Sequence, residues 1–337
     1  MDYRYLGRTG LRVSELCLGT MTFGWKIDEA ESHRILDAFS TAGGNFIDTA
    51  DVYAAGGSET ILGSWLKEND RDDFVIATKV RGATGKGAND IGLSRKHIMK
   101  AVKDSLRRLG TDYIDIYQAH AWDPATPLRE TLLALDSLVE EGMVRYIGAS
   151  NFRGWQLQKA VDMSLEMGLS QFCSLQPQYS LLCRATEFEL IPACLDAGIG
   201  VIPWSPLKGG ILSGKYRKGS DEPPESTRYG EAFREGNRAG WESVNRQSTW
   251  ELLDTLRATA QSKGKSMAQI ALNWLLRKPG VTSPIIGARS IAQLEENLGS
   301  TGWELTAEDI AALDAKSAPD VSHPYDTFAE QQQRRGR

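Results

Sequence analysis

Short β-rich runs alternate with longer segments of helical periodicity along this chain. The helical segments, such as 28–43 and 94–110, carry apolar residues three and four positions apart, with an acceptable cap in front and glycine behind. Repeated βα units of this kind predict a parallel sheet covered by helices. The runs expected to be strands are 15–19, 46–49, 74–79, 113–120, 144–150, 172–176, 200–205 and 283–288.

Eight strand–helix units favour one α/β fold, the (β/α)8 TIM barrel, over a doubly wound sheet. The chain has 337 residues, somewhat more than a typical barrel, and no shift in composition marks a domain boundary. We therefore expect a single domain over residues 1–337, in which the segment before the first strand forms an N-terminal β-hairpin plug. The polar, breaker-rich segment 215–246 is expected to be a long mobile loop after strand seven, and 318–337 a C-terminal tail.

Composition argues against several classes of protein. The formal net charge is -5, and the terminal "QQQRRGR" suits a solvated tail, so a nucleic-acid partner is not expected. No apolar stretch is long enough for a signal peptide or a membrane span, which favours a cytoplasmic protein with no membrane partner. The cysteines form no CxxC pair, so reduced thiols are expected rather than disulfides or a zinc site; they are Cys17, Cys173, Cys183 and Cys194.

Polar residues stand where consecutive strands end, and a barrel carries its chemistry at the carboxyl ends of its strands. In "FIDTADVY" Asp48 ends the second strand and Tyr53 follows five residues later. Lys79 ends the third strand and His120 the fourth. Each residue alone has an ordinary structural explanation, as a helix cap, a solvated lysine or amphipathic packing. The four residues together predict an active site, because active sites collect titratable side chains.

These four side chains suit the protonation of an oxygen that is becoming an alkoxide. A phenol with its ordinary pKa near 10 is a sluggish acid at neutral pH. An ammonium at about 4 Å attracts the phenolate by roughly 4 kcal/mol, so we expect Lys79 to lower the pKa of Tyr53 more than moderate burial raises it. Asp48 would hold Lys79 protonated. His120 would hydrogen-bond and orient the substrate oxygen.

No side chain can deliver hydride, so this chemistry requires a nicotinamide cofactor. Trp204 offers a face for stacking, and the carboxamides of Asn151 and Gln176 are able to pair with the nicotinamide amide, although a core aromatic and loop-capping amides remain alternative explanations. Phosphates are expected at the Gly-rich segment 205–216 and at 287–297, after strands seven and eight. In the second of these segments, Arg289, Gln293 and Asn297 recur every four positions, which places them on one face of a helix. Ordinary surface residues also show this spacing. An arginine beside a helix start favours NADPH over NADH.

At these residues the chain resembles the aldo-keto reductase superfamily over nearly its whole length. The motifs that carry the resemblance, in order and spacing, are "GTMTFG" (19–24), "FIDTADVY" (46–53), "ATK" (77–79), "QAHAWD" (118–123), "GASNF" (148–152), "WSPL" (204–207) and "IIGARS" with the downstream "QLEEN". The resemblance implies a carbonyl reductase that uses NADPH, with catalytic roles for Asp48, Tyr53, Lys79 and His120. It also implies cofactor contacts by Gly19, Thr20, Ser150, Asn151, Gln176, Trp204, Ser205, Leu207, Gly209, Lys215, Gly287, Arg289, Gln293 and Asn297.

Two positions depart from the pattern of many members of that superfamily. Pro177 stands where many have asparagine after the strand-six glutamine, so the contact expected there is that of Gln176. Trp204 stands where many stack the nicotinamide on tyrosine or phenylalanine, and the larger ring narrows the space for the substrate. Trp25 and Trp122 would flank the opening, either as walls for a small-molecule carbonyl substrate or as rim packing.

The sequence argues against two other functions and is compatible with a third. Gly209 to Lys215 matches the start of a phosphate-binding P-loop, but Tyr216 replaces the required serine or threonine and no helix should follow, so an NTPase is not expected. A metal-dependent hydrolase would need clustered ligands, whereas only His120 lies at the mouth, so no metal is expected. A cofactor-binding regulatory subunit remains open, because potassium channel beta subunits resemble the same superfamily and keep the same four residues.

Overall fold

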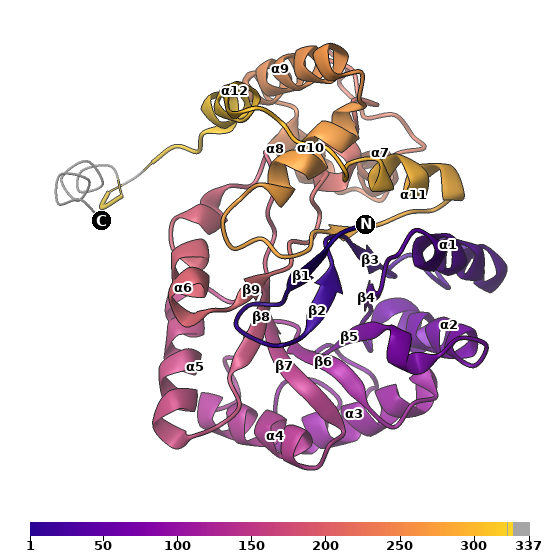
Figure 1. Cartoon of the computed structure of the whole chain (residues 1–337), viewed down its shortest axis with the longest axis vertical. Helices are drawn as coiled ribbons and strands as arrows, with labels where there is room; N and C mark the ends of the chain where they lie inside the picture. Colours follow the sequence, from indigo (N-terminus) through magenta and orange to yellow (C-terminus); the bar gives the residue numbers. More distant parts are fainter. Residues whose placement is uncertain (322, 326–337) are drawn as a thin grey trace.

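The computed structural model describes residues 1–321 and 323–325 and contains an eight-stranded parallel sheet. Its hydrogen-bonded order is β10-β3-β4-β5-β6-β7-β8-β9, so every strand expected from the sequence is present (Figure 1). The two edges of the sheet also meet, because Ile285 N of β10 donates to the carbonyl of Pro203, two residues after β9, at 2.8 Å. The strands are β3 (Cys17–Gly19), β4 (Phe46–Asp48), β5 (Val75–Val80), β6 (Ile114–Ala119), β7 (Val144–Ser150), β8 (Phe172–Gln176), β9 (Gly200–Val201) and β10 (Ile285–Ile286).

The last two strands are shorter than their sequence pattern suggested. β9 and β10 contain two residues each, whereas six were expected in each run. Proline has no backbone N–H with which to continue a ladder of hydrogen bonds. Pro203 and Pro284 lie within two residues of these strands and limit their length.

Helices surround the strands, as the βα pattern predicted (Figure 1). Local signals fix their ends: the Ser94 side chain accepts from His97 N at the start of α3, and Gly110 ends that helix in the left-handed region. The helices are α1 (Glu29–Thr41), α2 (Gly57–Leu66), α3 (Arg95–Leu109), α4 (Leu128–Glu140), α5 (Gly154–Met167), α6 (Leu190–Ala197), α7 (Arg228–Arg234), α8 (Arg238–Val244), α9 (Gln247–Lys263), α10 (Met267–Leu276), α11 (Ile291–Leu298) and α12 (Ala307–Ser317).

Alternation along the strands divides the apolar residues into two buried clusters. In β5, Val75 and Ala77 belong to a small cluster shared by several strands, whereas Ile76 and Val80 belong to the large cluster that includes the helices. The small cluster is therefore the interior of the ring of strands. Because strand side chains alternate, the next residue on the interior side of β5 is Lys79.

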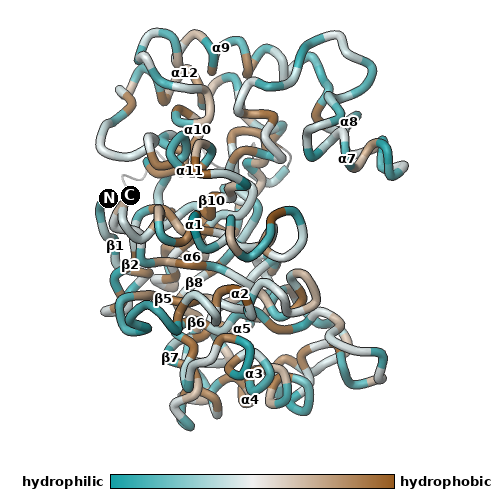
Figure 2. The backbone as a smooth tube through the Cα atoms, turned by 90° about the vertical axis from the view of Figure 1, so that its right-hand side faces the viewer, coloured by the Kyte–Doolittle hydropathy of each residue, from teal (hydrophilic) through white to brown (hydrophobic). Residues whose placement is uncertain are grey.

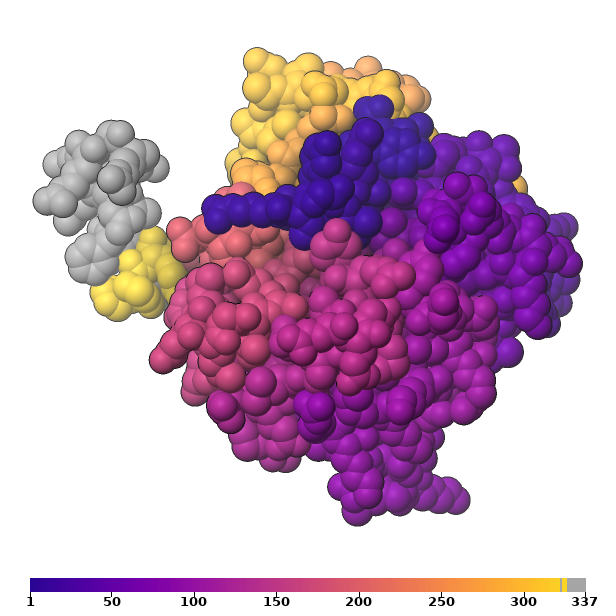
Figure 3. Space-filling model, turned by 60° about the horizontal axis from the view of Figure 1, so that its bottom comes forward, coloured from indigo at the N-terminus to yellow at the C-terminus, as the bar shows by residue number. Residues whose placement is uncertain are grey.

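The N-terminal segment forms the expected hairpin, in which β1 (Tyr3–Tyr5) pairs antiparallel with β2 (Arg12–Ser14). Leu6 and Val13 of this segment belong to the interior cluster. In the space-filling view the indigo hairpin lies beside the yellow C-terminal segment and the magenta middle of the chain (Figure 3).

The segment 215–246 is not an irregular loop throughout, which corrects the expectation from its breaker-rich composition. It contains α7 and α8, which lie together to one side of the molecule (Figure 2). Aromatic packing explains this order, because buried Tyr216 stacks on buried Trp241 at 5.6 Å and Trp241 also contacts Trp250 of α9. The mobility expected of this segment stays a prediction. The proposed tail, 318–337, lies mostly outside the described residues.

Candidate active site

Asp48, Tyr53, Lys79 and His120 meet at the carboxyl ends of β4, β5 and β6. Lys79 Nζ lies 2.6 Å from Asp48 Oδ2 and 3.3 Å from the Tyr53 hydroxyl oxygen. The Tyr53 and His120 rings pack edge to face with centroids 5.9 Å apart. Lys79 is completely buried and Asp48 nearly so. The four residues singled out in the sequence therefore form one contiguous cluster.

Two local features bring these side chains together: the alternation of side chains along the strands and a strained turn after Tyr53. Phe46 belongs to the interior cluster, and Asp48, two residues later, points to the same side as Lys79 of the neighbouring strand. Directly after Tyr53, Ala54 and Ala55 adopt positive φ values of 49° and 54°. Such angles are costly for residues other than glycine and are found where surrounding structure imposes them. The turn brings the phenol back over the end of β5.

The charge balance at Tyr53 differs from the sequence-based expectation. Burial raises the pKa of Tyr53 above its ordinary value of 10.0, and the Lys79 ammonium offsets only part of that increase. The expectation that Lys79 makes the phenol acidic is therefore wrong for this structure, because desolvation outweighs the attraction of one ammonium that is itself paired with Asp48. Tyr53 is a neutral hydroxyl, available as a proton donor.

Beside that hydroxyl, Lys79 is charged and His120 is neutral. Burial lowers the pKa of Lys79, but the attraction of Asp48, with a contribution from Tyr53, more than offsets this and leaves the pKa above its ordinary value. Burial, with repulsion from Lys79 and Arg81, lowers the pKa of His120 to about 3. His120 is therefore a neutral imidazole at physiological pH, able to donate one hydrogen bond without carrying charge.

Carboxamides enclose the buried acid and connect it to the neighbouring strands. Gln176 Nε2 donates to Asp48 Oδ1 at 2.8 Å, and Gln118 Nε2 donates to the same oxygen at 3.2 Å. Asn151 Nδ2 donates to the His120 carbonyl at 3.0 Å, and Trp204 Nε1 donates to Asn151 Oδ1 at 3.0 Å. The residues expected to hold a nicotinamide are thus brought together, with Asn151 and Gln176 engaged by neighbouring protein groups.

The residues expected to hold phosphate cluster around the start of α11. Arg289 N donates to Gln293 Oε1 at 2.9 Å, and Asn297 Nδ2 donates to Gly287 O at 3.2 Å. A Cβ built on Gly287 would meet no atom within 4 Å, so the space beside this backbone is open. The Arg289 side chain forms an ion pair with Glu231 of α7 at 3.1 Å, a partner that the sequence did not suggest.

The other expected cofactor residues lie at the ends of β3 and β7, where Gly19 and Ser150 are the last strand residues, and on the turns after β3 and β9. Ser205, Lys208 and Gly209 have positive φ values of 52°, 47° and 64°, so the chain after β9 follows a tight and irregular path. Thr20 and Ser150 are buried, and their hydroxyls bond to the carbonyls of Asp48 and Gln176. These two hydroxyls support the strand ends. The remaining expected residues of this group are Gly19, Leu207 and Lys215.

Aromatic side chains form one side of the mouth. Trp122, two residues after His120, packs edge-on against Phe152 and against Trp155 in the first turn of α5, with ring centroids 5.4 and 5.5 Å away. Trp155 keeps 55% of its surface exposed and Trp25, from the turn after β3, keeps 60%. Trp122 and Trp155 thus form a shared aromatic wall, whereas the ring of Trp25 contacts Lys26 Nζ, which lies 4.3 Å from the ring centroid.

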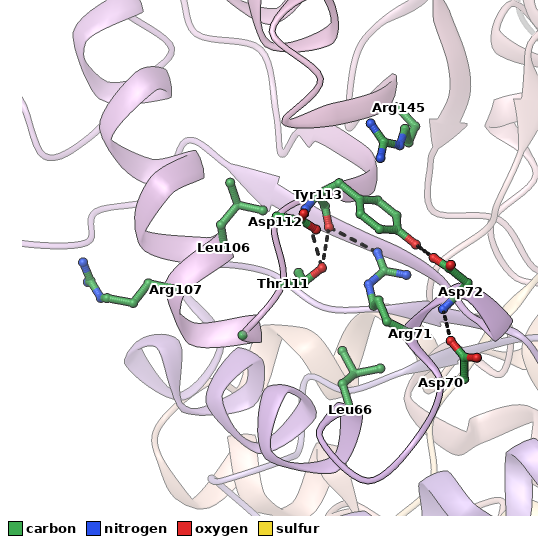
Figure 4. A pocket seen from close by; sticks show the side chains of 11 residues that line it. Leu66, Asp70, Arg71, Asp72, Leu106, Arg107, Thr111, Asp112, Tyr113 and Arg145 are labelled. Carbon is green, nitrogen blue, oxygen red and sulfur yellow. Dashed lines mark hydrogen bonds between the residues drawn. The ribbon is translucent and has the colours of Figure 1, made fainter.

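A cavity of about 910 Å³ lies away from this cluster, before the amino ends of β5 and β6 (Figure 4). There the Tyr113 ring lies between the guanidinium groups of Arg71 and Arg145, each about 4 Å from its centroid. Arg71 also donates to the carbonyls of Phe74 and Tyr113 and to Asp115. Because these groups bond to each other and none belongs to the site above, we interpret the cavity as structural, consistent with its place at the bottom of a barrel.

Within residues 1–321 and 323–325, none of the helices is both long and apolar enough to cross a bilayer. The same part has no group of three or more histidine, cysteine, aspartate and glutamate side chains that could hold a metal ion.

Comparison with known proteins agrees with this geometry. The model of the aldo/keto reductase family matches residues 15–318. The chain belongs to this family. Among related aldo/keto reductases, it is 39% identical over 327 residues to the uncharacterized oxidoreductase YrpG of Bacillus subtilis, covering 93% of this chain and 95% of that protein. It is 35% identical over 353 residues to versiconal hemiacetal acetate reductase of Aspergillus parasiticus, covering 96% and 99%.

The chain is also similar to proteins named for a different role. A probable voltage-gated potassium channel subunit beta of Oryza sativa is 38% identical over 303 residues, covering 88% of this chain and 90% of that protein. Similarity of this degree does not separate reductases from channel subunits, since both groups match at nearly the same identity.

Sequence reasoning missed several residues of this site. Gln118 carried a usable signal, because it precedes His120 by two residues in a strand and must point to the same side. Arg81 lies beside His120 with a positive φ of 145°, and its Nε donates to Trp122 O at 3.2 Å. The sequence pattern did not indicate Trp155 or Glu231, because each reaches the site only through the packing of its helix.

Proposed function

We propose that this aldo/keto reductase reduces an aldehyde or ketone to an alcohol by hydride transfer from NADPH, with Tyr53 donating the proton. The observation that supports this most is the placement of Lys79 Nζ between Asp48 and the Tyr53 hydroxyl, at distances of 2.6 and 3.3 Å. A buried ammonium beside a phenol stabilises the phenolate that remains after proton transfer. Neutral His120 would hold the substrate oxygen beside that phenol.

The residues around the mouth fit the proposed cofactor. Bound NADPH would supply hydride to the carbonyl carbon, which no side chain can do. Trp204 would stack on the nicotinamide, and Asn151 and Gln176 would bind its carboxamide after exchanging their present partners. Arg289 and the open backbone at Gly287 suit a phosphate, and an arginine there favours NADPH over NADH.

The proposed proton transfer uses the charge states found in this cluster. The carbonyl carbon accepts hydride while its oxygen takes the Tyr53 proton, so the C=O double bond becomes an alcohol and Tyr53 becomes a phenolate. Lys79 stabilises this phenolate, and Asp48 keeps Lys79 charged and oriented. Solvent then returns a proton to Tyr53. His120 stays neutral throughout and contributes orientation only.

Tyr53→Phe tests this function, because it removes the proton donor and leaves the surrounding packing nearly unchanged. We expect NADPH-dependent reduction of simple aldehydes to fall by about 10²- to 10⁴-fold. Quenching of protein fluorescence should show NADPH binding within about threefold of the wild type, because the substituted atom lies outside the expected phosphate region. Unchanged turnover in Tyr53→Phe would exclude Tyr53 as the acid.

A cofactor-binding regulatory subunit is the second candidate function, supported by the channel subunit relatives of Oryza sativa and Arabidopsis thaliana. The two functions predict different behaviour of purified protein. Steady oxidation of NADPH over many turnovers with a panel of aldehydes and ketones would favour the reductase. Binding of NADPH without multiple turnovers across that panel would favour the regulatory subunit.

A further inference from the structure

Arg81 is a partly buried cation at the rim of the candidate active site. It directly follows the last residue of β5, two positions after Lys79, and its backbone has a φ of 145°. The Arg81 carbonyl accepts from Gly92 N at 2.9 Å, which closes the loop that begins here. A positive φ is costly for a residue other than glycine and is found where the surrounding structure imposes it. The chain therefore holds Arg81 at this rim in spite of a conformational cost.

Only Nε of the Arg81 guanidinium is engaged by a described protein group. It donates to Trp122 O at 3.2 Å, which holds the guanidinium beside the segment that carries His120. Arg81 and His120 follow neighbouring strands, because Val80 and Ala119, the residues before them, are paired in register. Within residues 1–321 and 323–325, no hydrogen bond or ion pair joins a terminal nitrogen of Arg81 to another group. These terminal donors are therefore available to a ligand.

The Asp123 carboxylate attracts Arg81 without forming an ion pair with it. Its oxygens accept instead, at 2.7 to 2.9 Å, from the backbone N–H groups of Leu93 and Ala125 and from the hydroxyl of Thr126. Asp123 thus holds the loops after β5 and β6 and offsets the charge of Arg81 only from a distance.

The rim carries positive charge that protein groups only partly neutralise. Burial, followed by repulsion from Lys79 and Arg81, lowers the pKa of His120 to about 3. Lys79 is paired with Asp48, whereas Arg81 has no such partner among the described residues. Arg228 of α7 adds a further positive charge that acts on the phenol. A negative group on a bound substrate would therefore be attracted to this rim.

We propose that Arg81 is a specificity-determining residue, whose guanidinium binds a carboxylate of the substrate while the carbonyl lies between Tyr53 and His120. The inference deepens the proposed function and rests on it. A planar guanidinium presents parallel N–H donors that match the two oxygens of a carboxylate. One unpaired arginine, offset in part by Asp123, suits an anion of one negative charge better than a phosphate dianion. The substrate class is therefore aldehydes and ketones that also carry a carboxylate.

Trp122 connects Arg81 with the aromatic wall. Its carbonyl accepts from Arg81, and its ring packs against Trp155 with centroids 5.5 Å apart. An aromatic ring that bears a carboxylate can use both features, with the ring against the wall and the carboxylate on the guanidinium. Carboxybenzaldehydes are therefore suitable probes.

The test compares kcat/KM for 3- and 4-carboxybenzaldehyde with kcat/KM for the corresponding carbamoylbenzaldehydes, which have nearly the same shape and no charge. We expect the wild type to prefer at least one carboxylate to its amide. Arg81→Gln should lower that ratio about 10- to 100-fold, because a hydrogen-bonded charge pair is lost. Arg81→Lys keeps the charge without the planar fork, so it should recover only part of the ratio.

Lys86→Gln is the matched control, because Lys86 is an exposed cation of the same loop. It should keep the ratio of the wild type. A second measurement requires no catalysis: calorimetry with bound NADP+ compares 4-(hydroxymethyl)benzoate with 4-(hydroxymethyl)benzamide. Arg81→Gln should weaken binding of the benzoate selectively.

Three results would overturn the inference. The first is a wild type that uses and binds each carboxylate no better than its amide. The second is an unchanged ratio in Arg81→Gln. The third is an equal fall in Lys86→Gln, which would mean that the net charge of the loop alone is responsible. A wild type that reduces no aldehyde but binds the benzoate through Arg81 would contradict the proposed function and support the carboxylate site, so the two failures are distinguishable.

Discussion

Lys79 Nζ and the Tyr53 hydroxyl oxygen lie 3.3 Å apart at the mouth of the ring of strands. The ammonium is completely buried and its second partner, Asp48, is buried as well. Burying an ion pair removes both charges from water, a cost that their mutual attraction only partly recovers. The pair is therefore better explained by the charge it presents to Tyr53 than by a contribution to stability.

Lys79→Met should inactivate the protein and also destabilise it, because Asp48 is left as a buried and unpaired charge. Urea unfolding should show a loss of about 3–5 kcal/mol. The double variant Asp48→Asn with Lys79→Met removes both charges, so it should regain much of this stability and stay inactive. If the single and double variants are equally stable, the two side chains do not form a coupled pair.

Arg289→Ala should weaken NADPH binding far more than NADH binding. A hydrogen bond to a charged group contributes about 1.5–3 kcal/mol, so we expect about a 10- to 100-fold increase in the dissociation constant for NADPH. Fluorescence titration with each cofactor measures this directly. Equal weakening for NADPH and NADH would show that Arg289 does not contact the 2′-phosphate.

Most of the fold and the catalytic cluster were predictable from the sequence, because they depend on local patterns. Alternation fixes which side of a strand Asp48 and Lys79 face, and all strand ends of a parallel ring meet on one side. The balance of charges was not predictable, since the pKa of Tyr53 depends on how completely the surrounding loops exclude water. The ion pair of Glu231 with Arg289 was not predictable either, because the order within 215–246 comes from packing of Tyr216 and Trp241.

Trp155→Ala should weaken binding of planar aromatic carbonyl substrates, because Trp155 and Trp122 form the aromatic wall beside His120. An aromatic pair contributes about 0.5–1.5 kcal/mol, so KM for such substrates should rise about two- to twelvefold. The KM of a small aliphatic aldehyde should be unchanged. Leu165→Ala is the matched control, since Leu165 is an exposed apolar residue of the same helix, 58% exposed. A uniform change across both substrate types would argue for a general distortion of α5.

Asp51, two residues before Tyr53, is buried, and neither of its carboxylate oxygens has a side-chain hydrogen-bond partner among the described residues. Burial and the negative charge of Glu59 raise its pKa from 3.8 to about 7, with Arg108, the backbone N–H of Val52 and Lys79 offsetting only part. Well below its ordinary pKa of 3.8 the carboxyl is protonated in both the folded and the unfolded protein, so ionisation costs nothing. As the pH rises toward 7, the unfolded chain ionises freely while the folded protein must either keep its proton or bury a charge.

The free energy of unfolding should therefore fall as the pH rises from about 4 to about 7, and level off above that range. Asp51→Asn keeps the shape and cannot ionise, so it should be more stable than the wild type at pH 8, by up to about 4 kcal/mol at 1.36 kcal/mol per unit of pKa shift. The two proteins should approach each other in stability near pH 4. Urea unfolding at pH 5, 6, 7 and 8 measures this. Parallel curves for wild type and Asp51→Asn would show that another group titrates in this range, since the expected difference between them grows with every unit of pH up to 7.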